Sequence, residues 1–233
     1  MALTQDDDRS DNLSTAEKIN MFFQKNRKML LFAFIGAIVV FAGFIIGITV
    51  RDSMSGRALT RADEFNRRWN ELRLNAVTDE AETMEEQAEL AVFLTELDGF
   101  ARKTFGFAAA RSYSLLGDIF AEQKNWADSE GAYLKAAKAA GKSYLAPVSF
   151  FNAAVAAEEQ ENIESAIEHY KRSLDFENSF PAAARAQFSI GRLEESRNNR
   201  IAALAAYATV TAKWPDEQLW ANMAHSRIIA LSD

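Results

Sequence analysis

The longest hydrophobic stretch of the chain runs from Met29 to Val50, 22 residues without a charge or a proline. A helix of about 20 apolar residues crosses the hydrocarbon core of a bilayer, so this stretch predicts a transmembrane helix at 29–50. A cleaved signal peptide is the alternative, but its apolar region is shorter, about 7 to 15 residues, and ends in a small-residue cleavage site. The sequence after Val50 has no such site, which favours a retained anchor.

The rest of the chain shows helical patterning. Apolar residues recur at helical spacing over 58–75, over 81–103 and again after Pro215, and no segment alternates apolar and polar residues as a half-buried strand does. We therefore expect an all-α protein. Residues 51–106 should form a divergent first hairpin and residues 107–233 a set of repeats closed by a capping helix.

Within 107–233, three classes of position recur every 37 residues: Gly117, Ala154 and Gly191; Ser129, Ala166 and Ala203; Tyr133, Tyr170 and Tyr207. A small residue lets two antiparallel helices approach closely, and the aromatic ring fills the space beside the contact. One hairpin cannot bury its apolar face alone, so the hairpins are expected to stack as a solenoid. Gly117 and Gly191 are expected to accept alanine but no larger side chain.

These positions resemble the signature of the tetratricopeptide repeat (TPR), most closely in the first unit. There the matching residues are Tyr113, Leu116, Gly117, Phe120, Trp126, Ser129, Tyr133 and Ala136. The usual period is about 34 residues, so extra residues are expected in turns such as 141–147. Pro147, Pro181 and Pro215 fall where first helices should begin, where the missing N–H does no harm. The resemblance implies a solenoid of about four hairpins plus a capping helix.

Residues 1–28 are expected to form a polar tail containing a short juxtamembrane amphipathic helix, opened by a capping box at Ser14 and Glu17. The alternative is a tail without structure. Lys25, Arg27 and Lys28 precede the predicted span, and this small excess of positive charge favours an N-terminus inside the cell.

Three glycines of the predicted span lie on nearly one face: Gly36, Gly43 and Gly47. Small residues at such spacing let two membrane helices pack closely, which would make a homodimer through the span. Glycine is also common in membrane helices, so coincidental spacing is the alternative.

Composition excludes several classes of function. The net charge of −7 belongs to residues 51–233, because residues 1–28 hold five acidic and five basic residues and the predicted span holds neither. An acidic surface argues against nucleic-acid binding. The chain has no cysteine, which excludes disulfides, thiol catalysis and cysteine-ligated metals.

The sequence shows no catalytic or cofactor motif. His169 and His225 lie in different units without the paired spacing of metal ligands, and no glycine-rich phosphate loop occurs. His169 is expected at a solvated edge, and the acidic run that includes Glu158 and Glu159 is expected on a solvated face. We therefore expect no enzymatic activity, no cofactor and no metal.

In TPR arrays the first helix of each hairpin lines the concave surface, so the resemblance places a partner-binding groove there. By register the inward positions are Arg111, Ser114, Leu115, Asp118, Phe151, Asn152, Val155, Arg185, Phe188 and Arg192. Phe151 and Phe188 occupy equivalent positions near arginines, the combination that protein-binding hot spots use. The alternative is that both rings pack between hairpins.

The order of parts resembles the YfgM family of bacterial inner-membrane proteins: Phe22 and Phe23, one span, a divergent hairpin, then Thr104-Phe105-Gly106 before the repeats. The resemblance implies a single-pass inner-membrane protein with a cytoplasmic N-terminus and periplasmic repeats. It also implies contacts with the secretory translocon and with periplasmic chaperones or client proteins. A scaffold for envelope assembly or cell division and a cytoplasm-facing membrane receptor remain as alternatives.

Overall fold

The computed structural model of the protein describes residues 22–24, 26–29, 36, 40–41, 55–74 and 84–232. The chain separates into two compact units, Met1–Gly56 and Arg57–Asp233. In the first unit the described residues are helical. The rings of Phe22 and Phe23 meet edge to face with their centroids 6.3 Å apart, and Asn26 Nδ2 donates a hydrogen bond to the Phe22 carbonyl oxygen at 3.1 Å.

The second unit is built from helices throughout its described residues. Its first helical segment is the helix at 55–74, of which residues 57–74 belong to this unit. The labelled elements follow in chain order: α2 (Met84–Lys103), α3 (Gly106–Glu122), α4 (Trp126–Ala140), α5 (Leu145–Glu159), α6 (Ile163–Leu174), the 3-10 helix η1 (Glu177–Ser179), α7 (Ala183–Ser196), α8 (Arg200–Lys213) and α9 (Gln218–Ser232).

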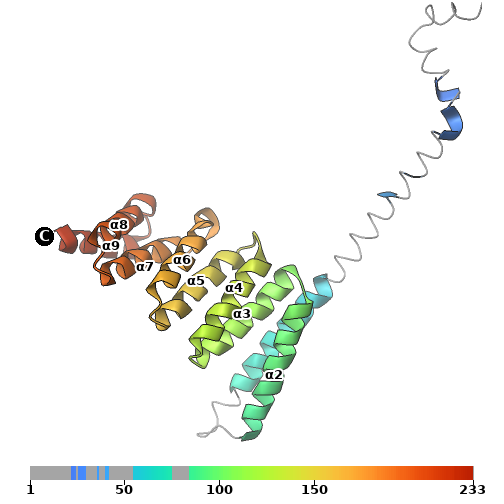
Figure 1. The fold of residues 1–233 in the computed structure, drawn as a ribbon, viewed down its shortest axis with the longest axis horizontal. Coiled ribbons are helices and arrows are strands. Elements are labelled where there is room, and N and C mark those ends of the chain that lie inside the picture. The colour runs from blue at the N-terminus through green and yellow to red at the C-terminus, as the bar shows by residue number, and fades with distance from the viewer. Residues whose placement is uncertain are drawn as a thin grey trace, which may run out of the picture. The chain divides into compact units, whose positions relative to one another are not determined.

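The helices stack in the order of the sequence. From α2 to α9, each α-helix packs against the next one along the chain, and Figure 1 shows them as a row of paired helices. In addition α3 contacts α5, and α7 contacts α9. We call α3, α5, α7 and α9 the first-helix layer, and α4, α6 and α8 the second-helix layer.

The 37-residue period arises from tyrosine rings that pack against the backbone of the facing helix. A Cβ on Gly117 would lie 2.6 Å from Tyr133 Cδ1, and a Cβ on Gly191 would lie 2.6 Å from Tyr207 Cε1. The expectation that both glycines accept alanine freely therefore needs correction, because each ring would have to shift. The second repeat has Ala154 at this position, in the same core cluster as Tyr170.

The turn inside each hairpin follows the same period. Three residues spaced 37 apart adopt positive φ, at 57°, 58° and 61°: Lys124, Glu161 and Asn198. An asparagine follows each of them and precedes the second helix. The Asn162 side chain accepts a hydrogen bond from the Ser165 amide at 3.3 Å, and Asn199 accepts from the Ala202 amide at 3.4 Å. These asparagines begin α6 and α8 by satisfying an N-terminal N–H group.

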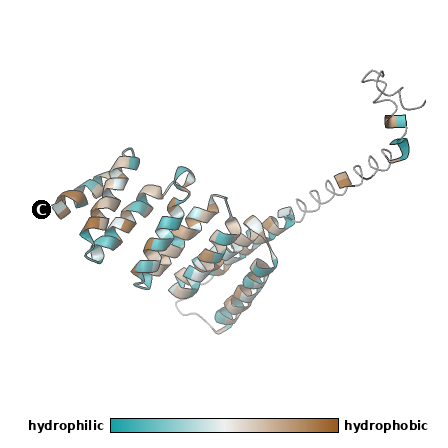
Figure 2. Ribbon diagram, turned by 45° about the horizontal axis from the view of Figure 1, so that its top comes forward, coloured by the Kyte–Doolittle hydropathy of each residue, from teal (hydrophilic) through white to brown (hydrophobic). Residues whose placement is uncertain are grey.

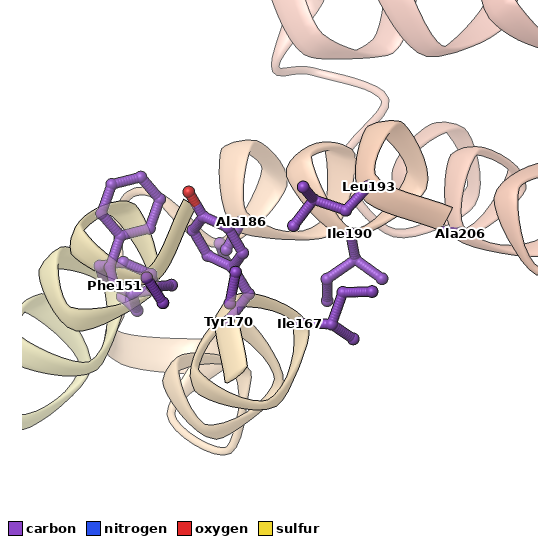
Figure 3. Packing of buried hydrophobic residues seen from close by; sticks show 12 residues of the cluster. Phe151, Ile167, Tyr170, Ala186, Ile190, Leu193 and Ala206 are labelled. Carbon is purple, nitrogen blue, oxygen red and sulfur yellow. The ribbon is translucent and has the colours of Figure 1, made fainter. Parts of the chain in front are cut away.

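Apolar clusters join the hairpins to one another. Phe65 packs with Phe93 and Leu97 of α2 and with residues of α3 and α4, so the helix at 55–74 and α2 pack together against the first repeat. A second cluster joins α5 and α6 to α7 and α8. Figure 3 shows Tyr170 beside Phe151 in this cluster, with Ile167 near Ile190.

The last helix, α9, closes the stack. Trp220 and Ile228 of α9 pack against the cluster formed by Phe188, Tyr207 and their neighbours on α8. Leu219, by contrast, is 64% exposed. Helix α9 thus covers the apolar face of the third repeat, the role of a terminal cap in a solenoid.

The predicted fold is wrong in one element, the transmembrane helix at 29–50. No helix among the described residues is both long enough and apolar enough to cross a membrane. Most of 29–50, including Gly43 and Gly47, lies outside those residues, and a Cβ added at Gly36 would meet no atom within 4 Å beyond its own helix backbone and chain neighbours. In Figure 2 the helices of the second unit mix hydrophilic and hydrophobic residues along their length. The corrected fold class is an all-α TPR-like repeat fold.

We expect Gly117→Ala to be less stable than the matched variant Gly131→Ala. Both replacements gain helix propensity, roughly 1 kcal/mol relative to glycine, but nothing lies within 4 Å of the Cβ position of Gly131. The difference between the two variants isolates the contact with Tyr133, and overpacking of this kind costs about 1 to 3 kcal/mol. Urea unfolding measures both free energies, and equal values would show that the tyrosine–glycine contact does not set the hairpin spacing.

Candidate functional site

Tyrosine hydroxyls and carboxylates form a repeated pair along the first-helix layer. In each hairpin the tyrosine lies on the second helix and donates to a carboxylate on the first. The three distances are 2.6 Å for Tyr133 Oη to Asp118 Oδ1, 2.6 Å for Tyr170 Oη to Glu158 Oε1, and 2.9 Å for Tyr207 Oη to Glu195 Oε2. We call these pairs the carboxylate ladder. Hydrogen bonds to an ionised acceptor are stronger than neutral ones, so each rung fixes the two helices of its hairpin.

Two rungs are completed by an arginine from the next first helix. Arg192 of α7 pairs with Glu158 of α5, and Arg227 of α9 pairs with Glu195 of α7. The two glutamate side chains are only 17% and 23% exposed. A carboxylate withdrawn from water in this way requires a countercharge. The arginines provide it and connect neighbouring hairpins.

The first rung differs from the other two. In the first repeat Ala121 stands at the position of the ladder glutamates. Tyr133 therefore donates to Asp118, which lies three residues before Ala121 on α3. The residue 37 positions before Arg192 is Val155, so α5 offers no cation at this register. Within the described ranges, no lysine or arginine forms an ion pair with Asp118.

The surroundings of Asp118 disfavour its charged form. Its side chain is open to solvent, but it is surrounded by protein atoms on a hollow part of the surface. This restricted solvation raises the pKa of the Asp118 carboxyl, the hydrogen bond from Tyr133 lowers it, and the charge of Glu122 raises it further. Asp118 is thus an accessible acid with less stabilisation of its charge than an ordinary surface carboxylate has.

Asp118 lines a pocket of about 230 Å³ between the helix at 55–74, α3 and the start of α5. The lining residues are Ala62, Asn66, Arg111, Ser114, Leu115, Asp118, Tyr144 and Leu145. Arg111 Nη1 pairs with Asp63 Oδ1 at 2.5 Å. The four positions on α3 that the sequence places in the groove, Arg111, Ser114, Leu115 and Asp118, all line this pocket.

The two predicted phenylalanines lie in the core. Phe151 and Phe188 are each 7% exposed. The Phe151 ring lies 5.2 Å from that of Tyr170, and the Phe188 ring lies 5.2 Å from that of Tyr207 and 5.6 Å from that of Trp220. This placement agrees with the alternative that the sequence left open, in which both rings pack between hairpins.

The remaining predicted groove residues differ in how well they are paired. Arg192 is bound to Glu158 and Arg111 to Asp63, and Val155 packs against the core cluster. Arg185 is exposed, with its guanidinium carbon 4.9 Å from the centre of the Phe151 ring. Asn152 is half-buried. Within the described part of the chain, neither the Arg185 nor the Asn152 side chain forms a hydrogen bond or an ion pair.

The structure corrects two expectations about polar residues. Glu158 is not on a freely solvated face, because it accepts from Tyr170 and pairs with Arg192. His169 is 6% exposed rather than at a solvated edge. Its Nε2 lies 2.8 Å from Glu130 Oε1, while its Nδ1 is buried without a hydrogen-bond partner among the described residues.

The sequence holds a signal for the ladder that belongs to no known motif. Glu158 and Glu195 stand 37 residues apart, each twelve residues before a repeat tyrosine. Tyr144, Asn66 and Asp63 carried no such signal, because they come from a loop and from the divergent first hairpin. Nowhere in the described ranges do three or more histidine or acidic side chains converge as metal ligands would.

The fold and the ladder define a stacked helical-repeat protein. No known protein-family profile matches the chain. It is 32% identical over 228 residues, 92% of this chain and 93% of the relative, to the TPR repeat-containing protein of Treponema pallidum (strain Nichols). The chain therefore belongs to the TPR repeat-containing proteins. This all-α repeat fold is typical of non-enzymatic scaffolds and supports a role in protein interaction.

We expect the protein to lose stability in alkali through its ladder tyrosines. Burial raises the pKa of Tyr133 and of Tyr170, and so do the charge of Asp118 and the hydrogen bond to Glu158, respectively. As the pH rises above about 10, the unfolded chain releases these protons while the folded chain keeps them, so the free energy of unfolding falls. The slope is up to about 1.4 kcal/mol per pH unit for each tyrosine.

Urea unfolding of wild type and of Tyr170→Phe at pH 8 and pH 11 tests this expectation. At pH 8 the variant should be less stable by about 1 kcal/mol, the typical contribution of one hydrogen bond. Between pH 8 and pH 11 it should lose less stability than wild type does. The same loss in both proteins would show that Tyr170 does not keep its proton in the folded state.

Proposed function

We propose that the first-helix layer binds an extended segment of a partner protein. The observation that carries this proposal is the pocket at α3, which has polar lining residues and an aspartate that pairs with no lysine or arginine among the described residues. Binding sites are typically hollows in which a few polar groups fix the orientation of the ligand. The TPR relative supports the general role in protein interaction.

Arg185 and Asn152 extend this surface along the layer beyond the pocket. An exposed arginine held over an aromatic ring is partly ordered before it binds anything, which lowers the entropy lost on binding. The Asn152 amide can donate and accept at once, which matches the backbone of an extended peptide. The buried Phe151 acts as the platform for Arg185 rather than as a contact residue.

We propose that the partner is the secretory translocon, a periplasmic chaperone or a client protein. The support is the resemblance of the parts outside 29–50, namely Phe22 and Phe23, the divergent hairpin and Thr104-Phe105-Gly106 before the repeats, to translocon-associated proteins. This narrower proposal puts the repeats in the periplasm. Protease added to intact and to lysed spheroplasts tests that location, and copurification distinguishes translocon partners from proteins of envelope assembly or cell division.

We expect Arg185→Ala to weaken peptide binding and Arg172→Ala to leave it unchanged. The two arginines are matched, because Arg172 on α6 is also exposed and lies 4.0 Å over the ring of Phe150. Only Arg185 belongs to the first-helix layer. Fewer than about a third of interface residues cost more than 1 kcal/mol when truncated, and arginine is enriched among them. We expect Arg185 to be one of these residues, which corresponds to a loss of about fivefold or more in Kd.

The measurement uses a random dodecapeptide phage library selected on the wild-type chain. The best synthetic peptide is then titrated against both variants by fluorescence anisotropy. Equal affinities for Arg185→Ala and Arg172→Ala would exclude the surface around Arg185. Failure to enrich any peptide would overturn the proposed function itself.

A further inference from the structure

The pocket beside Asp118 has one uncompensated negative charge. Three carboxylates bear on this charge: Asp118 lines the pocket, Asp63 pairs with the lining residue Arg111, and the charge of Glu122 raises the pKa of Asp118. Two guanidinium groups oppose them, with Arg111 bound to Asp63 and Arg73 Nη1 lying 3.0 Å from Glu122 Oε1. Three negative and two positive groups leave one negative charge, and the unpaired carboxylate is Asp118.

The other rungs of the ladder show what completes such a carboxylate. In the second and third repeats, the ladder glutamate accepts from a tyrosine and also pairs with an arginine of the next first helix. In the first repeat Asp118 Oδ1 accepts from Tyr133. Its other oxygen, Oδ2, accepts no hydrogen bond from the residues that the structure describes, and Val155 stands in the register of the arginine.

We propose that the pocket binds a lysine or arginine side chain of the partner segment, which pairs with Asp118 and completes the first rung of the ladder. This inference rests on the proposed function and names the chemistry that the first-helix layer recognises. The acidic balance of the chain, −7 overall, favours encounter with a basic partner.

The walls of the pocket suit the long aliphatic stem of a basic residue as well as its charge. Ala62, Leu115 and Leu145 contribute apolar groups. Tyr144 is 65% exposed, and its ring centroid lies 5.7 Å from that of Phe107. An exposed tyrosine ring attracts a cation that passes over its face, and lysine or arginine stems pack on apolar surface while their charge reaches a polar partner. The volume of about 230 Å³ far exceeds the roughly 10 to 15 Å³ that one water requires.

The test begins with the dodecapeptides selected from the phage library on the wild-type chain. We expect the enriched sequences to contain lysine or arginine more often than the unselected library does. One lysine-containing peptide is then synthesised twice, with lysine and with its uncharged isostere norleucine at the same position. The lysine peptide should bind wild type about tenfold more tightly, the value of one charge-assisted hydrogen bond.

Three variants locate this preference. Asp118→Asn keeps an acceptor for Tyr133 but removes the charge, so the two peptides should bind it with equal affinity. Glu168→Gln is the matched control, because Glu168 is an exposed acid on α6 outside the pocket, and it should keep the tenfold preference. Ser114→Lys places a cation four residues before Asp118 on the same face of α3, and it should abolish the preference with the Asp118 charge still present. Circular dichroism melting confirms that each variant is folded.

Each outcome of these experiments tests a different part of the proposal. Enriched peptides without an excess of basic residues would overturn the basic-side-chain inference and leave the proposed function standing. A lysine preference that persists in Asp118→Asn and Ser114→Lys would show that the basic residue binds elsewhere. Failure to enrich any peptide would overturn the proposed function and this inference with it. Loss of the preference in both variants, and its retention in Glu168→Gln, would establish the site.

Discussion

The close approach of a tyrosine ring to the backbone of the facing helix governs the rest of this structure. The ring needs a position without a side chain, or with a single methyl group, and Gly117, Ala154 and Gly191 provide it. The hydroxyl of the same tyrosine reaches the first-helix layer, where it donates a hydrogen bond to a carboxylate. The spacing of the two helices and the position of a negative charge on the binding face are therefore set by one residue in each repeat.

The ion pairs of the ladder contribute specificity of stacking more than stability. The arginine side chains are about half exposed, 52% for Arg192 and 45% for Arg227, and ion pairs of this kind typically contribute about 0 to 1 kcal/mol. The apolar clusters beneath them contribute more, because burying one large apolar side chain contributes about 1.5 to 3 kcal/mol. The arginines matter because they match one first helix to the next and neutralise glutamates that would otherwise be costly to bury.

The sequence predicted those parts of the fold that depend on residue size and spacing. Small and aromatic residues in register located the hairpins, and the apolar pattern after Pro215 located the cap. The transmembrane element rested on the length of one apolar run, and it is the part of the fold prediction that failed. Lys124 and Glu161 adopt positive φ, which their side chains do not signal, since glycine and asparagine are the usual residues there.

The candidate site was only partly predictable, because its chemistry depends on contacts between elements distant in sequence. The register of α3 placed Arg111, Ser114, Leu115 and Asp118 on one face, and these four residues line the pocket. The burial of His169 was not predictable from its neighbours, because Glu130, which holds it, lies 39 residues away on another helix. The burial of Phe151 was unpredictable for the same reason, because it depends on Phe180 and α7 rather than on its own helix.

Repetition and departure from it have separate roles in this chain. Where the ladder is completed by an arginine, at Glu158 with Arg192 and at Glu195 with Arg227, the charges on the first-helix layer neutralise one another. Where it is broken, at Ala121 and Val155, a carboxylate of the same ladder faces a pocket instead of an arginine. The presence of Ala121 and Val155 at these repeat positions costs little stability, because the Asp118 side chain stays open to solvent beside the pocket. A repeat array can acquire a specific binding position in this way, by omitting an internal partner rather than by adding a new functional group.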